Sequence, residues 1–199
     1  KIVRKVFEPR QKDLEKHFNQ GRALQEAVLG RLVAEAKDTE YGRNHAFASI
    51  KGYDDFIKHT PVNTYEELKG SIDRMRHGET DILWPGRVKW YAKSSGTTND
   101  KSKFIPVSKE GLKNIHYRGG FDAVAMYLQN NPQSRMFDGR GLILGGSHAP
   151  NYNLKDSLVG DLSAILIENI NPLANLVRVP KKQTIARSEE RRVGKECRS

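Results

Sequence analysis

SSGTTNDKSK, residues 94–103, joins an aromatic run to an apolar one. The preceding run is VKWYA (88–92) and the following run is FIPV (104–107). Strand-like runs on both sides of a short turn that contains glycine predict a hairpin. Successive backbone N–H groups of a tight turn can surround an anion, and Ser and Thr hydroxyls add further donors. The turn therefore predicts a loop for the phosphates of a nucleotide, although a plain solvent turn has a similar composition.

Each residue type in the turn suits phosphate for a different reason. Gly96 lets the backbone adopt angles that a side chain would forbid, and Lys103 carries a mobile positive charge. Four hydroxyls complete the donors, those of Ser94, Ser95, Thr97 and Thr98. The turn is not a Walker loop, because GxxxxGK[ST] is absent and the chain continues into a strand rather than a helix.

The sequence around the turn alternates between helical and strand patterns. One long helix, or two in tandem with Gly21 as a weak point, is predicted over 8–37 by apolar residues at mostly helical spacing, namely Leu14, Phe18, Leu24, Val28, Leu32 and Ala36. Thr64 and Glu67 form a capping box that opens a helix ending near Arg76. The other charged residues of that helix, Arg76 included, are expected on its solvated face. Ser108 is placed to cap a helix over 109–128.

Short apolar runs bounded by glycine or proline predict the strands. They cover 82–84, 88–93, 104–107 and a buried strand at 141–146. Short helices are expected at 53–57 and over 160–167, where Asp161 can serve as N-cap. The aromatic residues Trp84, Trp90 and Tyr91 are expected to be buried sheet residues rather than stacking partners for bases. This alternation predicts an α/β fold without internal repeats.

The last thirteen residues stand apart from the rest. Residues 187–199 (RSEERRVGKECRS) resemble the translated read-through of a DNA sequencing adapter, so we expect a non-native tail there and one partial domain over 1–186. The 199 residues include 34 Lys and Arg against 24 Asp and Glu, a net charge of +10. Without the tail the charge is +8, from 29 basic and 21 acidic residues, and the only cysteine, Cys197, is excluded.

Charge and cysteine content limit the classes of function. A domain without thiols uses neither disulfides nor a cysteine metal site, which favours a reducing compartment, and the cytoplasm is the expected location. Basic residues often adjoin acids, as in Lys12-Asp13, and no block reaches five or six like charges. No apolar run approaches the roughly 18 to 20 residues that span a bilayer. We expect neither nucleic acid nor a membrane as partner, with a basic nucleic-acid-binding module as the alternative.

Residues 64–108 resemble the auxin-responsive Gretchen Hagen family of acyl-acid amido synthetases, in its bacterial branch. The block reads TYEELKGSIDRMRHGETDILWPGRVKWYAKSSGTTNDKSKFIPVS, and it is supported by AKDTEYGR, HYRGG, LGGSH and GDLSAILIENI on both sides. The likeness covers residues 9–186. It implies the amino-terminal part of the large domain of an adenylate-forming enzyme, with the adenine-binding, metal-binding and hinge segments beyond Ala186. The fragment alone is then expected to be inactive.

The resemblance implies a two-step ligation. A carboxylic acid reacts with ATP to give an acyl-adenylate and pyrophosphate, and an amino acid then forms the amide as AMP leaves. By motif match Ser94, Ser95, Gly96, Thr97 and Thr98 hold the ATP phosphates, and Lys103 is the catalytic cation. Mg²⁺ is implied as the ion that offsets phosphate charge, and no residue of this sequence is assigned to it. A coenzyme A ligase of the same superfamily is the alternative, because it shares the first step.

His148 is the candidate for contact with the acyl substrate. It follows the apolar run that ends at Gly146, and α/β folds place ligands at loops that follow strand carboxyl ends. An ordinary loop histidine is the alternative. The sequence identifies neither the acid, nor the amino acid, nor the oligomeric state.

Overall fold

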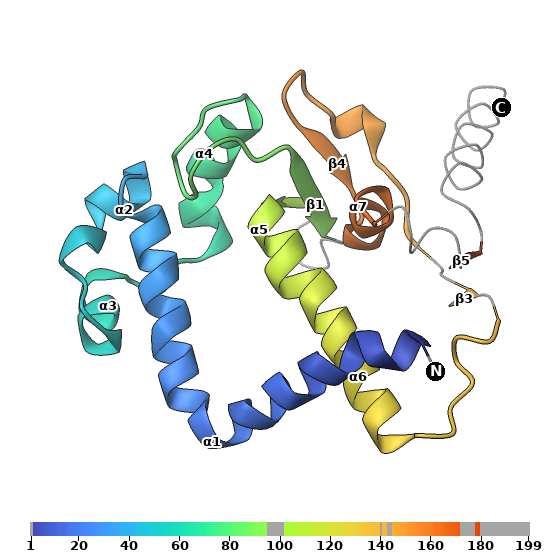
Figure 1. Ribbon diagram of the computed structural model, residues 1–199. Helices are drawn as coiled ribbons and strands as arrows, with labels where there is room; N and C mark the ends of the chain where they lie inside the picture. The colour runs from blue at the N-terminus through green and yellow to red at the C-terminus, as the bar shows by residue number, and fades with distance from the viewer. Residues whose placement is uncertain (1, 95–101, 140, 143–144, 172–177, 180–199) are drawn as a thin grey trace, which may run out of the picture.

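A small mixed sheet is flanked by helices in the computed structural model, which describes residues 2–94, 102–139, 141–142, 145–171 and 178–179 (Figure 1). Strand β1 (Trp90–Ser94) lies between β2 (Lys103–Val107) and β4 (Leu158–Gly160). It pairs antiparallel with β2 and parallel with β4. The predicted α/β class and the predicted hairpin are confirmed, and Pro106 lies on the edge strand, where its missing N–H costs no ladder hydrogen bond.

Helices cover both faces of this sheet. Because successive strand side chains point to opposite faces, Tyr91 and Trp90 lie on different sides of β1. Tyr91 packs against α4 (Tyr65–Arg76) through Ile72. Trp90 packs against a second cluster built by Leu112 and by Ile165 of α7 (Leu162–Glu168). Tyr91 and Ile165 are fully buried, so both layers exclude water from the strand between them.

The capping box at the start of α4 is confirmed. The Glu67 N–H donates to the Thr64 hydroxyl over 3.4 Å, and the Thr64 N–H donates to the Glu67 carboxylate over 2.6 Å. The backbone and side-chain hydrogen bonds from Thr64 lower the pKa of Glu67. The helix begins at Tyr65, as the sequence predicted, because these bonds satisfy N–H groups that have no partner inside the helix. It also ends at Arg76, as predicted.

The first helix, α1 (Ile2–Ala36), consists of two arms. Gln20 has non-helical angles (φ −127°, ψ 21°) beside Gly21, so the tandem-helix interpretation is confirmed, and Figure 1 shows the bend. The first arm packs on α6 (Arg118–Asn130) through Phe7, and Arg10 forms an ion pair with Asp122 at 2.6 Å. These contacts connect segments more than a hundred residues apart.

The second arm of α1 buries part of the predicted face: Ala36 is buried as expected, and Val33 is buried in place of Val28 and Leu32. Val33 and Ala36 pack against Phe47 of η1 (Phe47–Ser49). Val28 and Leu32, which were expected in the core, are 49% and 39% exposed. The spacing of Val33 and Ala36 is helical too, and the segment that follows the helix decides which of the two apolar stripes is covered.

Two short helices follow α1. The short helix predicted at 53–57 is confirmed as α3 (Tyr53–His59), whereas α2 (Glu40–Asn44) was not predicted. The buried Thr39 hydroxyl accepts the Gly42 N–H over 3.0 Å and donates to the Ala36 carbonyl over 2.7 Å. The Thr39 hydroxyl therefore binds the last turn of α1 and also caps the first turn of α2.

Ser108 caps the helix after β2, as predicted, by accepting the Gly111 N–H over 2.9 Å. The helical segment runs without a break through α5 (Lys109–Gly111), η2 (Leu112–Tyr117) and α6. The stretch η2 is π-helical, a widening that recurs at functional sites.

Two predicted strands are wrong. Residues 82–84 belong to a bend that opens at Asp81 (φ 59°) and closes at Gly86 (φ 71°), and the Asp81 carboxylate accepts the Gly86 N–H over 2.8 Å. The buried strand expected at 141–146 is only the exposed pair β3 (Gly141–Leu142), which pairs with β5 (Arg178–Val179). Residues 143 and 144 lie outside the described residues.

Strand β4, with the turn η3 (Pro150–Tyr152) before it, was not predicted. The end of β4 leads directly into α7, and Asp161 is the N-cap residue, as expected. The Asp161 side chain does not cap its own helix, because it accepts the N–H of Ser147 over 2.9 Å instead.

Candidate functional site

The two ends of the hydroxyl-rich turn face each other across the hairpin. Ser94 pairs with Lys103 in the register of β1 and β2. The other predicted phosphate contacts lie outside the described residues, namely Ser95, Gly96, Thr97 and Thr98. Their role stays a prediction, and the structure locates the strands from which the turn departs.

The exit of the turn is fixed against the start of α4. The Tyr65 hydroxyl accepts the Phe104 N–H over 3.0 Å, and the Lys103 ammonium lies 5.5 Å from the centre of the Tyr65 ring. An ammonium over an aromatic face is attracted to it and keeps N–H donors for other partners. Lys103 is therefore oriented at the mouth of the hairpin without losing its capacity to bind an anion.

Two further cations lie near this end of the hairpin, and the sequence did not single them out as site residues. The Lys93 ammonium is 4.4 Å from the centre of the Tyr152 ring. The Arg76 guanidinium is 3.9 Å from the centre of the Phe104 ring, and it donates to the Tyr152 carbonyl over 2.7 Å. The expectation that Arg76 lies on a solvated helix face is wrong, because its planar head covers an aromatic ring of β2.

A pocket of about 560 Å³ lies along β2, the edge strand of the sheet. Its apolar wall comes from several elements that are distant in sequence: Met75, Leu83, Val88, Ala92, Ile105, Val107, Ile115 and Leu162. Lys93, Ser94, Ser108 and His116 are among the polar residues that complete the lining. An apolar cavity with a few polar groups is the usual form of a site for a small organic ligand. Its wall includes Ser94, the first residue of the predicted phosphate turn.

His148 lies in the loop that precedes η3, and its surroundings are well defined. Its ring is 5.6 Å from that of Trp90, and its backbone forms a bridge to Gly160. An added Cβ at Gly160 would lie 3.1 Å from the His148 Nδ1 atom, and one at Gly146 would lie 2.1 Å from the Asp161 carboxylate. The close approach of His148 to Gly160 explains the glycine of GDL, and that of Asp161 to Gly146 explains the second glycine of LGGSH. His148 does not line the pocket along β2, and its contact with a substrate stays a prediction.

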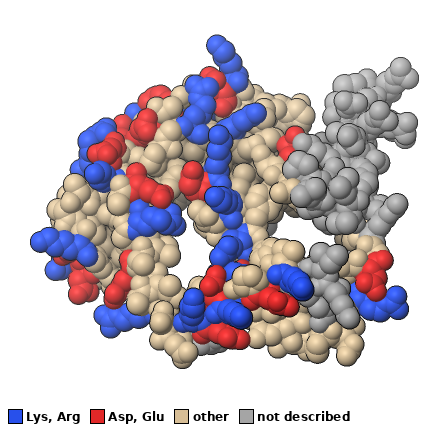
Figure 2. Space-filling view, in the orientation of Figure 1, with Lys and Arg blue, Asp and Glu red and all other residues tan. Residues whose placement is uncertain are grey.

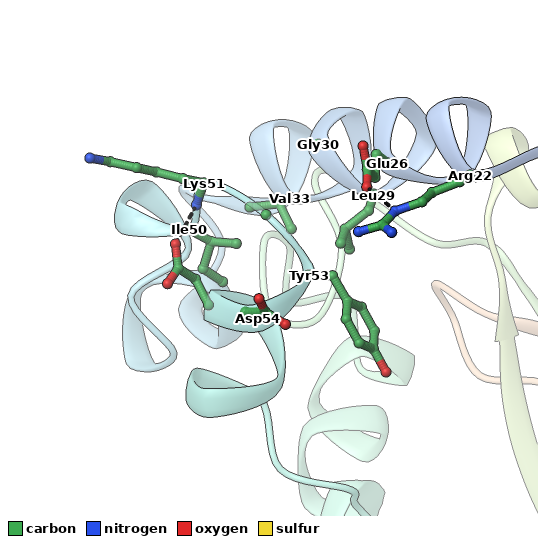
Figure 3. A pocket seen from close by; sticks show the side chains of 11 residues that line it. Arg22, Glu26, Leu29, Gly30, Val33, Ile50, Lys51, Tyr53 and Asp54 are labelled. Carbon is green, nitrogen blue, oxygen red and sulfur yellow. Dashed lines mark hydrogen bonds and ion pairs between the residues drawn. The ribbon is translucent and has the colours of Figure 1, made fainter. Parts of the chain in front are cut away.

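A second pocket, of about 500 Å³, lies between the second arm of α1 and α3 (Figure 3). Leu29, Val33 and Ile50 form its apolar floor. Two carboxylates at its rim have partners: Glu26 forms an ion pair with Arg22 at 3.0 Å, and Asp55 accepts the backbone N–H of Lys51 over 3.1 Å. None of the hairpin residues that the structure describes lines this pocket, so we place the candidate site at β2.

Charge is mixed over the molecule. Figure 2 shows basic and acidic side chains side by side over much of one face, as the sequence predicted. No helix in the described part of the chain is long and apolar enough to cross a membrane. Within the same residues, no group of three or more His, Cys, Asp or Glu side chains could hold a metal ion.

Comparisons with known proteins agree on one family. The model of the GH3 family N-terminal domain matches residues 10–190. The probable indole-3-acetic acid-amido synthetase GH3.1 of Arabidopsis thaliana is 34% identical over 90 residues, which are 45% of this chain and 15% of that protein. The 4-substituted benzoates-glutamate ligase GH3.12 of Arabidopsis thaliana is 26% identical over 118 residues, 58% of this chain and 20% of that protein.

The fold is similar to that of a solved GH3.15 acyl acid amido synthetase. The TM-score is 0.71 at 19% sequence identity, over 87% of this chain and 30% of the solved one. A structure of AtGH3.15 acyl acid amido synthetase in complex with 2,4-DB matches with a TM-score of 0.67 at 22% identity, over 84% of this chain and 28% of the solved one. The chain therefore spans less than a third of the length of the relatives that it matches.

Proposed function

The chain belongs to the GH3 family, and we propose from this premise that its parent protein is an ATP-dependent ligase that joins a carboxylic acid to an amino acid. The observation that carries the proposal beyond family membership is the apolar pocket along β2, whose wall includes Ser94. A carboxylic acid with an apolar body suits that pocket, with its carboxylate toward the turn. The relatives reported above are named as amido synthetases or as an acid–amino acid ligase.

The proposed chemistry has two balanced steps. A carboxylate oxygen bonds to the α-phosphorus of ATP, and the bond to the bridging oxygen breaks, so that pyrophosphate leaves with the electron pair. The amine of an amino acid then attacks the acyl carbon, AMP leaves, and the amine loses a proton. Both steps develop negative charge on phosphate oxygens, which positioned donors and cations stabilise.

The residues of the turn have distinct proposed roles. Lys103 supplies a positive charge to the phosphates, and its position over Tyr65 supports this assignment. The backbone and hydroxyls of the turn bind the ATP phosphates, through Ser94, Ser95, Gly96, Thr97 and Thr98. His148 remains the candidate for a contact with the acyl group. Mg²⁺ comes with the family's use of ATP, and the described residues neither support nor locate a site for it.

Exchange of labelled pyrophosphate into ATP tests the first step in the full-length parent protein. Exchange should depend on an added acid and should be lost in the S95A and K103M variants. A K89M variant is the matched control, because Lys89 is an exposed cation on the approach to β1. No exchange with any acid of a broad panel would refute the proposal.

Product analysis separates the alternatives. Amino acid and coenzyme A are offered together, and mass spectrometry should find the amide. A thioester instead would identify an acyl-coenzyme A ligase of the same superfamily. Nucleic-acid binding that weakens steeply with salt, without any exchange activity, would favour the basic binding module.

Three finer statements belong to the same proposal. We place the protein in the bacterial branch of the family and in the cytoplasm, and we propose that the native domain covers 1–186, followed by a non-native tail at 187–199. The family match ends at residue 190, four residues into the proposed tail. Sequencing the uninterrupted gene past the codon for Ala186 tests whether the tail is native. We expect the gene to continue the family match there, in place of the codons for RSEERRVGKECRS.

A further inference from the structure

Three cations from three elements gather on the α4 side of the hairpin. Arg76 is the last residue of α4, Lys93 belongs to β1, and Lys103 is the first residue of β2. We call these three residues the cation cluster. Each lies over a different aromatic ring, at 3.9 Å for Arg76, 4.4 Å for Lys93 and 5.5 Å for Lys103.

The rings beneath the cations are themselves connected. Phe104 and Tyr152 have ring centres 5.6 Å apart, and the Phe104 N–H is bound to the Tyr65 hydroxyl. Arg76 adds a hydrogen bond of 2.7 Å to the Tyr152 carbonyl. The end of α4, the hairpin and η3 are thus tied together, so the cation cluster is held by packing rather than by counter-ions.

The cation cluster lacks acidic partners among the described residues. Its three side chains are half-buried, and none forms an ion pair there. The Nε atom of Arg76 is buried and has no hydrogen-bond partner in the described part of the chain. By contrast, Arg10, Arg74 and Arg87 all bind carboxylates. Partly buried like charges without counter-ions are unfavourable, and a bound anion would remove that cost.

We propose that the cation cluster binds a condensed phosphate chain of at least two phosphoryl groups, such as pyrophosphate or the β- and γ-phosphates of ATP. Lys93 and Lys103 contact the phosphoryl oxygens. Arg76 is a positioning residue, which stacks on Phe104 and anchors Tyr152 under Lys93. The inference deepens the proposed function, on which it rests, because it adds Lys93 and Arg76 to the residues that hold the leaving group.

Calorimetric titration of the 199-residue chain with inorganic pyrophosphate tests the inference directly. Each charge-assisted contact is worth about a 10- to 100-fold change in affinity, so K93M should weaken pyrophosphate binding by about that factor. The matched K89M variant removes an exposed cation of the same segment and should bind as the unaltered chain does. Equal affinity in K93M and K89M, or no binding of pyrophosphate by the unaltered chain, would overturn the inference.

The test of Arg76 must separate its positioning role from the effect of its positive charge. R76K keeps the charge but loses the planar stack on Phe104, so it should weaken pyrophosphate binding several-fold while leaving the melting temperature within the range of an R87K control. Arg87 is a suitable control because it binds Asp156 at 2.7 Å outside the cluster. Unchanged pyrophosphate affinity in R76K contradicts the positioning role.

Two further probes define the ligand. Orthophosphate should bind more weakly than pyrophosphate, and a single-stranded oligonucleotide should not displace pyrophosphate at equal phosphate concentration. Preferential binding of the oligonucleotide would refute a free condensed phosphate as the ligand. Amide formation by the full-length protein is measured separately. If the parent protein makes the amide but the 199-residue chain does not bind pyrophosphate, this inference is refuted and the proposed function is not.

Discussion

Replacing Gly42 by alanine should destabilise the chain by about 3 kcal/mol, the upper part of the range for overpacking a filled site. An added Cβ would lie 2.1 Å from the Ala36 carbonyl oxygen and 2.9 Å from that of Lys37. Both obstacles are backbone atoms at the end of α1, so no side-chain rotation relieves the overlap. Helix α2 must move away instead.

That movement would break other bonds of the same segment. Thr39 binds the Gly42 N–H and the same Ala36 carbonyl, and the Tyr41 N–H donates to the Ile82 carbonyl over 2.9 Å. A displaced α2 cannot keep both. Close approach of α2 to the end of α1 is therefore the physical reason for the glycine in AKDTEYGR.

Gly30 provides the matched control within α1. An added Cβ there meets nothing within 4 Å, so G30A should stabilise the chain by up to about 1 kcal/mol, the helix preference of alanine over glycine. Urea unfolding followed by circular dichroism measures both variants, and G42A should also melt roughly 6 to 12 °C lower. The reasoning would be refuted if G42A were as stable as the unaltered chain. It would also be refuted if G30A lost as much stability as G42A.

Three other outcomes follow from individual contacts. The hydrogen bond from Arg10 lowers the pKa of Asp122. The pair therefore stabilises the fold at pH values above the unfolded pKa of about 3.9, and this stabilisation is lost as the pH falls through the lower folded pKa. D122N should reduce the free energy of unfolding by about 2 kcal/mol at neutral pH and should flatten the acid side of a stability–pH curve. Burial raises the pKa of Tyr91 to about 12, so its contribution is complete below the unfolded pKa of about 10 and is lost as pH rises towards the folded one. Since its hydroxyl is buried without a partner among the described residues, Y91F should keep or raise stability by about 1 kcal/mol and should remove that alkaline loss in the same curve. G146A should lower the melting temperature, because the Cβ would meet the Asp161 carboxylate at 2.1 Å.

Local chemistry made part of this fold predictable. Thr64 with Glu67, and Ser108 with Gly111, act over three residues, so the sequence contains both partners of each bond. The same holds for the hairpin around the hydroxyl-rich turn. The hydrophobic pattern of α1 contains two apolar stripes, and only the packing of Phe47 decides that Val33 rather than Leu32 is buried. At 82–84 an Asp81 side chain that closes a turn overrides the apolar run.

The candidate site divides in the same way. Ser94 and Lys103 were predicted because they flank a turn of distinctive composition. Arg76, Lys93 and Tyr152 are distant in sequence and ordinary in composition, and only the packing of α4 and η3 against the hairpin brings them together. No local pattern contains that information, because a cation that stacks on a distant ring looks like any surface cation in the sequence.

The pocket along β2 and the cation cluster differ in chemistry although Lys93 belongs to both, and the division of roles between them can be tested in the full-length protein. Adenylation brings a carboxylate to the α-phosphate. The apolar body of the acid needs an apolar environment, whereas the β- and γ-phosphates need a cationic one. On the proposed arrangement, I115W narrows the pocket along β2 and should raise the KM for the acid while the KM for ATP stays unchanged. R76K, which alters the cation cluster outside the pocket lining, should raise the KM for ATP and leave that for the acid unchanged. Steady-state kinetics of both single variants and the double variant measure this. The effects should multiply because Ile115 lies outside the cation cluster and Arg76 does not line the pocket. An I115W variant that raises the KM for ATP as much as that for the acid would contradict the division, since one group would then serve both substrates.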